Sequence, residues 1–197
     1  MKSFKEYISE TPQDLGPTSG NLTKSKYNST IYNSYLNHKK VGDINNMSVM
    51  HNKDGKESKY SVLDHENKRV AFQTRFERRP KNKEVPFSHH TQTYVNKHEQ
   101  SDLGKGFGHT FVYHHLINKH DIPLVSDKEQ YTGGHKMWNH LIDHSFKEGH
   151  HAYVLDSGKL TKITPENKDN LLSSTYGKDE SFRNKRYVIS KTNLKSN

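Results

Sequence analysis

The stretch "SDLGKGFGHTFVYHHLI", residues 101–117, contains three glycines that alternate with Lys105 and Phe107, and an apolar pattern of helical spacing follows directly. A glycine destabilises the interior of a helix or strand by about 0.5–1 kcal/mol relative to alanine, so three of them require an explanation. Two explanations are open. The glycines form tight turns, or they let the backbone approach a ligand, because unpaired N–H groups at a helix N-terminus bind anions such as a pyrophosphate.

The segments before the glycines predict antiparallel strands. Asp54-Gly55 is a strong hairpin signal between the strand-like segments 41–52 and 59–66. Residues 69–77 alternate, with Val70, Phe72, Thr74 and Phe76 on one face, and a further strand is expected over 89–96.

The segments after the glycines alternate between helix and strand. A helix over 111–116, a buried strand at "IPLVSD" and a helix from Thr132 to Gly149 are followed by a hairpin over 151–163 and a strand over 185–192. One central crossover between the antiparallel strands makes a parallel pair. The sequence therefore predicts an α+β fold with a mixed, mostly antiparallel sheet flanked by helices.

Composition narrows the class of protein. With 197 residues and an apolar fraction of 29%, the chain is expected to form one domain plus poorly ordered segments. It has no cysteine, which excludes disulfides and thiolate chemistry, and no apolar run of about 20 residues that would span a membrane. The formal charge of +9 favours polyanions, but no DNA- or RNA-binding motif accompanies it, so only non-specific nucleic-acid binding is expected.

The order of elements and the glycine loop resemble the GNAT superfamily of acyl-CoA-dependent N-acyltransferases. "GKGFGH" is neither a Walker A loop nor a dinucleotide fingerprint. In the GNAT family an Arg/Gln-x-x-Gly-x-Gly/Ala loop follows the fourth strand, and here Gly106 and Gly108 match while Leu103 replaces the Arg or Gln. The segment "LVSDKEQYTGGHKMWNHL" is similar to a divergent branch of this family in phage genomes.

The resemblance implies acetyl-CoA as cosubstrate and indicates which residues would bind it. The coenzyme is expected at the end of the strand before the loop and along the loop itself, on Tyr94, Val95, Gly104, Lys105, Gly106, Phe107, Gly108 and His109. No metal is expected, since a pair such as His140 and His144 arises by chance among 15 histidines.

A GNAT enzyme also requires a base for the amine and an acid for the departing thiolate. The fourth strand offers no carboxylate, so His90 is the candidate base, and Tyr131 is the candidate acid, with Asp127 at the end of the fifth strand. The alternative stays open that Tyr131 and Trp138 are packing residues and that Asp127 caps a turn.

The N-terminus "MKSFKEYISE" carries a second resemblance, to the short leaders of internal head proteins in large tailed phages. This resemblance implies cleavage after Glu10. The alternative is an ordinary N-terminal helix that is not a leader. The predicted organisation is a leader and linker over 1–38, an acyltransferase domain over 39–192 and a tail over 193–197.

Two functions follow as hypotheses. The first is acetyl transfer from acetyl-CoA to an unidentified amine, with a host protein among the candidate acceptors. The second is a non-catalytic scaffold that binds a host protein or nucleic acid through the basic residues Arg75, Arg78 and Arg79. The expected location is the host cytoplasm or the inside of the virion head, with no membrane partner.

Overall fold

The computed structural model describes residues 22, 25–44, 46–98, 103, 107, 111, 117–118, 121–126, 132–173 and 185–195. These ranges contain three helices, α2 (Ser25–Tyr35), α4 (Thr132–Lys147) and α5 (Lys168–Ser173). They also contain nine strands: β1 (Lys39–Ile44), β2 (Met47–Asp54), β3 (Glu57–Asp64), β4 (Arg69–Arg79), β5 (His89–Lys97), β6 (Leu124–Val125), β7 (His151–Asp156), β8 (Lys159–Ile163) and β9 (Lys185–Ser190).

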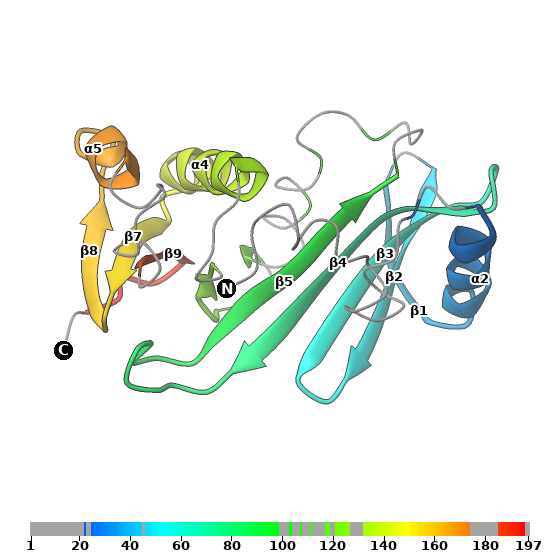
Figure 1. The fold of residues 1–197 in the computed structure, drawn as a ribbon, viewed down its shortest axis with the longest axis horizontal. Coiled ribbons are helices and arrows are strands. Elements are labelled where there is room, and N and C mark those ends of the chain that lie inside the picture. Colours follow the sequence, from blue (N-terminus) through cyan, green and yellow to red (C-terminus); the bar gives the residue numbers. More distant parts are fainter. Residues whose placement is uncertain are drawn as a thin grey trace, which may run out of the picture. The chain divides into compact units, whose positions relative to one another are not determined.

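The strands are hydrogen-bonded in the order β1-β2-β3-β4-β5-β6-β9-β7-β8 (Figure 1). Among the described strands β5 and β6 form the parallel pair of an otherwise mostly antiparallel sheet, and the predicted α+β class is confirmed. The chain divides into two compact units. Unit 1 comprises the described residues up to Arg75 together with Tyr94–Leu103, and unit 2 comprises Phe76–Thr93 and the described residues from Gly104 onward.

Two tight turns organise the strands of unit 1. The predicted Asp-Gly hairpin is confirmed: Asp54 pairs with Glu57, and Gly55 between them has a φ of 53°, which glycine adopts without steric cost. The expected single strand over 41–52 is instead two strands, because Ile44 pairs with Met47 and Asn46 takes a φ of 62°. Asparagine tolerates this left-handed conformation better than most residues, and such turns are typical of two-residue hairpins.

Helix α2 packs on the sheet of unit 1, within the 1–38 range that the sequence analysis assigned to a leader and linker. Its apolar face comprises Ile31, Tyr32 and Tyr35, which are buried in a cluster with Leu22, Met50, Leu63 and Val70. These three residues of α2 are therefore part of the unit 1 core.

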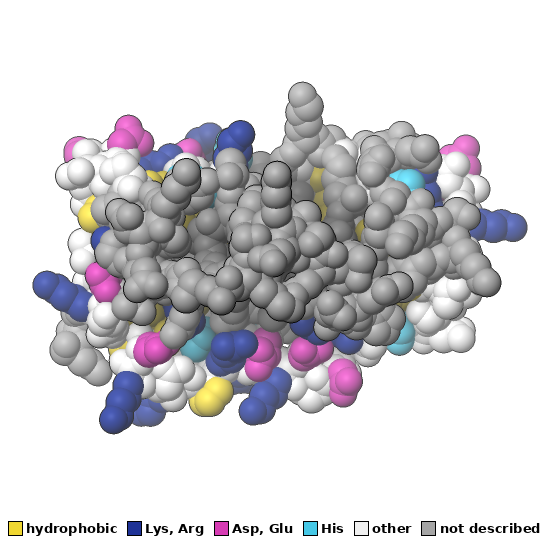
Figure 2. Space-filling model, viewed as in Figure 1, with side chains coloured by type: hydrophobic (Ala, Val, Ile, Leu, Met, Phe, Trp, Pro, Cys, Tyr) yellow, Lys and Arg dark blue, Asp and Glu magenta, His cyan; other side chains and the backbone are white. Residues whose placement is uncertain are grey.

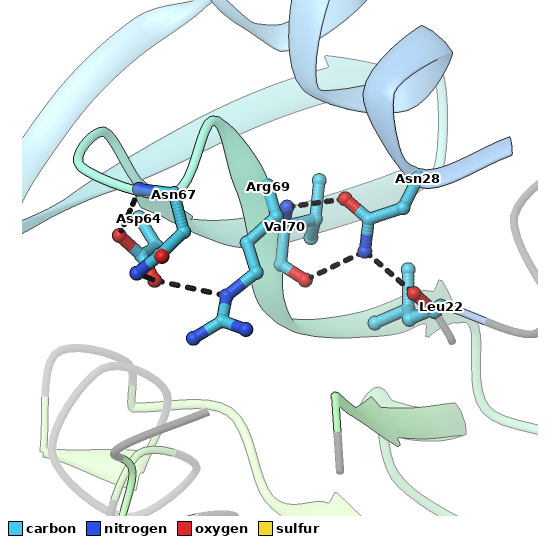
Figure 3. A network of polar contacts seen from close by, with 6 residues as sticks. All are labelled: Leu22, Asn28, Asp64, Asn67, Arg69 and Val70. Carbon is cyan, nitrogen blue, oxygen red and sulfur yellow. Dashed lines mark hydrogen bonds and ion pairs between the residues drawn. The ribbon is translucent and has the colours of Figure 1, made fainter. Parts of the chain in front are cut away.

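The side chain of Asn28 joins this helix to β4 (Figure 3). Its Nδ2 donates to the carbonyl oxygens of Leu22 (2.7 Å) and Val70 (3.0 Å), and its Oδ1 accepts from the Val70 N–H at 2.7 Å. Because Asn28 is only 2% exposed, these three bonds satisfy polar groups that would otherwise be buried without partners.

Asp64 closes the turn between β3 and β4 (Figure 3). Its carboxylate accepts hydrogen bonds from the backbone N–H and side-chain amide of Asn67 and from Arg69 Nε at 2.9 Å. Burial alone would raise the pKa of the Asp64 carboxyl, but these bonds and the Arg69 charge outweigh burial and hold its pKa below the ordinary value.

In unit 2, α4 and the hairpin of β7 and β8 match the predicted elements. Helix α4 begins at Thr132, buries Trp138, Leu141 and Ile142, and lies alongside β7 and β9 (Figure 1). Gly149, with a φ of 69°, follows its last turn. Strand β9 lies between β6 and β7, so the last strand in sequence is central in the sheet of this unit.

The opposite face of this sheet carries a second apolar cluster. It consists of Val85, Val125, Tyr153, Leu155, Leu160 and Val188, with Phe87 and Leu194 packed against them. Residues 80–88, between β4 and β5, thus cover the face of the sheet that α4 does not. No helix within the described ranges is long and apolar enough to cross a membrane.

Candidate functional site

The parallel pair provides the frame of the candidate site. His90 pairs with Leu124 and Thr91 with Val125, and the His90 N–H donates to the carbonyl oxygen of Pro123 at 2.8 Å. Because side chains alternate along a strand, His90 and Gln92 lie on one face of the sheet while His89 and Thr91 lie on the other.

Strand pairing assigns His90 to the face that α4 covers. Leu124, the partner of His90, pairs with Ile189 on β9, and paired residues share a face. Tyr187, two residues before Ile189, therefore also lies on this face, where its ring contacts Trp138 of α4 with centroids 5.8 Å apart. His90 is 8% exposed and Gln92 is 6% exposed, so the candidate base is largely shielded from water.

Only some of the other candidate residues lie within the described part of the chain. Tyr94 and Val95 lie on β5, and Phe107 is half-buried with its ring centroid 5.8 Å from that of Phe111. Leu103, which stands where the GNAT loop has Arg or Gln, is buried at 2% exposure. The remaining candidates lie outside the described residues: Gly104, Lys105, Gly106, Gly108, His109, Asp127 and Tyr131.

A polar cluster under α4 was not predicted from the sequence. The phenol oxygen of Tyr187 lies 2.9 Å from Nδ1 of His135, in the first turn of α4. Nε2 of His135 lies 3.5 Å from the side-chain amide of Asn139, one helical turn later. The backbone of Tyr187 exchanges two bonds with Ser126: the Ser126 N–H donates to the Tyr187 carbonyl, and the Tyr187 N–H donates to Ser126 Oγ.

The phenol–imidazole contact is suited to proton exchange. Burial lowers the pKa of His135, so its imidazole is neutral at pH 7 and can accept a proton. Tyr187 is only 1% exposed, so its contact with the His135 ring is shielded from water. The sequence carries one local signal for this cluster, the i, i+3, i+4 spacing of His135, Trp138 and Asn139 on one helix face.

The basic residues proposed for the alternative function differ in their pairing. Arg75 lies 3.4 Å from Glu57, and Arg79 lies 2.7 Å from Glu77. Arg78 between them is exposed. On the face shown in Figure 2, Lys and Arg side chains of the described residues are interspersed with Asp and Glu.

His144, the second histidine of the pair on α4, has an acidic neighbour. Nε2 of His144 lies 3.7 Å from a carboxylate oxygen of Glu148, and His140 is exposed. Within the described part of the chain, no group of three or more His, Cys, Asp or Glu side chains is arranged to hold a metal ion.

Comparison of the chain with protein-family models, with curated proteins and with solved structures finds no match.

Proposed function

We propose that the protein is an N-acetyltransferase that transfers an acetyl group from acetyl-CoA to an amine. The observation that supports this most is the parallel pair β5–β6, which interrupts a mostly antiparallel sheet and whose first strand, β5, is followed in sequence by the glycine loop. The resemblance to the GNAT superfamily implies such a pair, with the thioester beside it.

Strand β5 also fits the coenzyme. β5 continues to Lys97, six residues beyond Thr91, whereas the described residues of β6 end at Val125, the partner of Thr91. Within the described ranges, the pairing of β5 with β6 therefore ends at Thr91. The pantetheine arm of coenzyme A carries two amides, which can pair with backbone groups along the edge of a strand.

The reaction assigns one proton to each catalytic residue. The amine nitrogen of the acceptor attacks the thioester carbonyl carbon, and the carbon–sulfur bond breaks as the amide forms. His90 takes the proton that the amine loses, and Tyr131 donates a proton to the departing thiolate. The buried location of His90 keeps its imidazole away from bulk water.

Release of the coenzyme A thiol tests this proposal. Acetyl-CoA is incubated with the protein and a panel of amines (polyamines, a lysine peptide, an aminoglycoside), and free thiol is followed by a disulfide reagent. We expect Tyr131→Phe to lower turnover about 10²–10⁴-fold while acetyl-CoA affinity is retained, because only the acid is lost. His140→Gln, an exposed position on α4, is the control and should be unchanged.

An equal rate of thiol release in the parent and in Tyr131→Phe would contradict the assignment of Tyr131 as the acid. Binding of acetyl-CoA without turnover of any amine would instead favour the second function, a scaffold that binds a host protein or nucleic acid. For that alternative Arg78, exposed between two ion-paired arginines, is the first residue to test. Arg78→Glu should then weaken retention on DNA, and the loss should be greatest at low salt.

A further inference from the structure

On the face of β5 opposite α4, two buried polar atoms have no hydrogen-bond partner among the described residues: Nε2 of His89 and Oγ1 of Thr91. His89 is 0% exposed and Thr91 is 1% exposed. The two residues are separated by one position and so share a face of the strand, the face opposite α4. Buried polar side-chain atoms in folded proteins nearly always have a partner, so the pair requires an explanation.

The neighbours of Thr91 on the adjacent strands are apolar. Thr91 pairs with Val125, which pairs with Val188 on β9, and both valines are fully buried. Val85 and Phe87 pack against these valines.

The hydrogen bond on the other ring nitrogen fixes the tautomer of His89. Nδ1 lies 3.2 Å from the carbonyl oxygen of Phe87, and a carbonyl only accepts, so Nδ1 carries the hydrogen. Burial lowers the pKa of His89 and outweighs the hydrogen bond to the Phe87 carbonyl, which raises it. The charges of Arg186 and Arg79 lower this pKa further, and Glu77 opposes them. The ring is therefore neutral at pH 7, and Nε2 presents a lone pair that requires a donor.

This requirement excludes charged ligands. An anion such as chloride has no hydrogen to donate to Nε2. A cation is repelled by Arg186 and Arg79, and only one of the two atoms, Nε2, is a strong metal ligand. The Arg186 charge is offset in part by Glu84, which lies 3.1 Å away.

We propose that unit 2 holds an internal water that donates to Nε2 of His89 and is hydrogen-bonded to Oγ1 of Thr91. Water is a small neutral donor, and the threonine hydroxyl can either donate or accept. Two polar partners meet the minimum for a buried water. Because His89 and Thr91 flank His90, the water joins the side chains on both sides of that residue.

A double-mutant cycle tests the bridge. Thr91→Val removes the hydroxyl at nearly constant volume, and His89→Asn keeps a donor near Phe87 while deleting Nε2. If a water joins the two side chains, each single variant should lower the folding equilibrium constant about fivefold in urea denaturation. The double variant should lose less than the product of both effects, because the second change removes a bond already lost. Thr161→Val, at an exposed position on β8, is the matched control.

A crystal structure at high resolution, with ¹⁵N shifts of His89, completes the test. The expected result is a single water within hydrogen-bond distance of both atoms and an Nδ1–H tautomer. Stabilisation by Thr91→Val would overturn the proposal, because it would mean that the hydroxyl is buried without a partner. An Nε2–H tautomer, or a chloride at this position, would overturn it as well.

Discussion

The two units use their buried polar side chains differently. In unit 1, Asn28 and Asp64 accept or donate three hydrogen bonds each, within the protein and close to a helix or a turn. In unit 2, polar side chains gather along the parallel pair, with His90, Gln92 and Tyr187 on one face and His89 and Thr91 on the other.

This difference suggests separate roles for the two sets of side chains: those of unit 1 stabilise the fold, and those of unit 2 are suited to catalysis. The bonds of Asn28 and Asp64 fix the position of α2 and the turn between β3 and β4, so these two side chains serve the stability of unit 1. The imidazoles and the phenol of unit 2 are groups that exchange protons. Changes in unit 1 should therefore alter the free energy of unfolding, whereas changes in unit 2 should alter turnover more than stability.

The largest effect on stability is expected at Asn28. Asn28→Ala removes three buried hydrogen bonds of about 1 kcal/mol each and leaves backbone groups of Leu22 and Val70 without partners, so a loss of about 3 kcal/mol or more is expected in urea denaturation. Asn33→Ala, at an exposed position of the same helix, should change stability by less than about 0.5 kcal/mol. Equal effects of the two variants would contradict the role of Asn28.

A smaller effect, and a dependence on pH, is expected at Asp64. Asp64→Asn should lower stability by about 1.5–3 kcal/mol at pH 7, because bonds to a charged acceptor are lost. The folded pKa of Asp64 lies below the ordinary value of 3.8, so this stabilisation is complete well above pH 3.8 and is lost as the pH falls through the folded pKa.

Melting temperatures of both proteins between pH 7 and pH 2 measure this dependence. The difference between parent and Asp64→Asn should narrow as the pH falls below 3.8. A difference that stays constant over the whole range would mean that Asp64 does not titrate as its contacts imply.

The smallest effect on stability is expected at Tyr187. Tyr187→Phe removes one hydrogen bond, to His135, and should cost about 1 kcal/mol in urea denaturation. Tyr153→Phe is a matched control, because Tyr153 is also buried and its hydroxyl is bonded to Asn193 and Leu194. Since Tyr187 shares the face of His90 and Tyr153 does not, only Tyr187→Phe should also lower turnover. Equal turnover in the two variants would contradict the assignment of the catalytic site to the sheet face that carries His90.

Local signals predicted most of the fold. Asp54-Gly55 located the hairpin of β2 and β3, and the apolar stripe of α4 located its buried face. The change from alternating to helical spacing around the glycines predicted the crossover that makes β5 and β6 parallel. Each of these features depends on residues that are neighbours in the sequence.

Long-range contacts were not predictable in this way. Asn28 bonds to Val70, 42 residues away, so nothing near Asn28 in the sequence indicated that its helix belongs to the core. Tyr187 bonds to His135 across 52 residues, and only the assembled sheet places them together. Of the catalytic candidates, the structure places His90 on the parallel pair, and Tyr131 and Asp127 stay predictions from the resemblance.

Calorimetric titration of the whole chain with acetyl-CoA tests the central claim most directly. We predict one binding site per chain with a dissociation constant of about 1–1,000 µM, the range usual for enzyme substrates. Gly106→Asp should weaken binding at least tenfold without a change in the circular dichroism spectrum, because a side chain and a negative charge would enter the anion site. Equal affinity in the parent and the variant, or no binding at millimolar acetyl-CoA, would contradict the account.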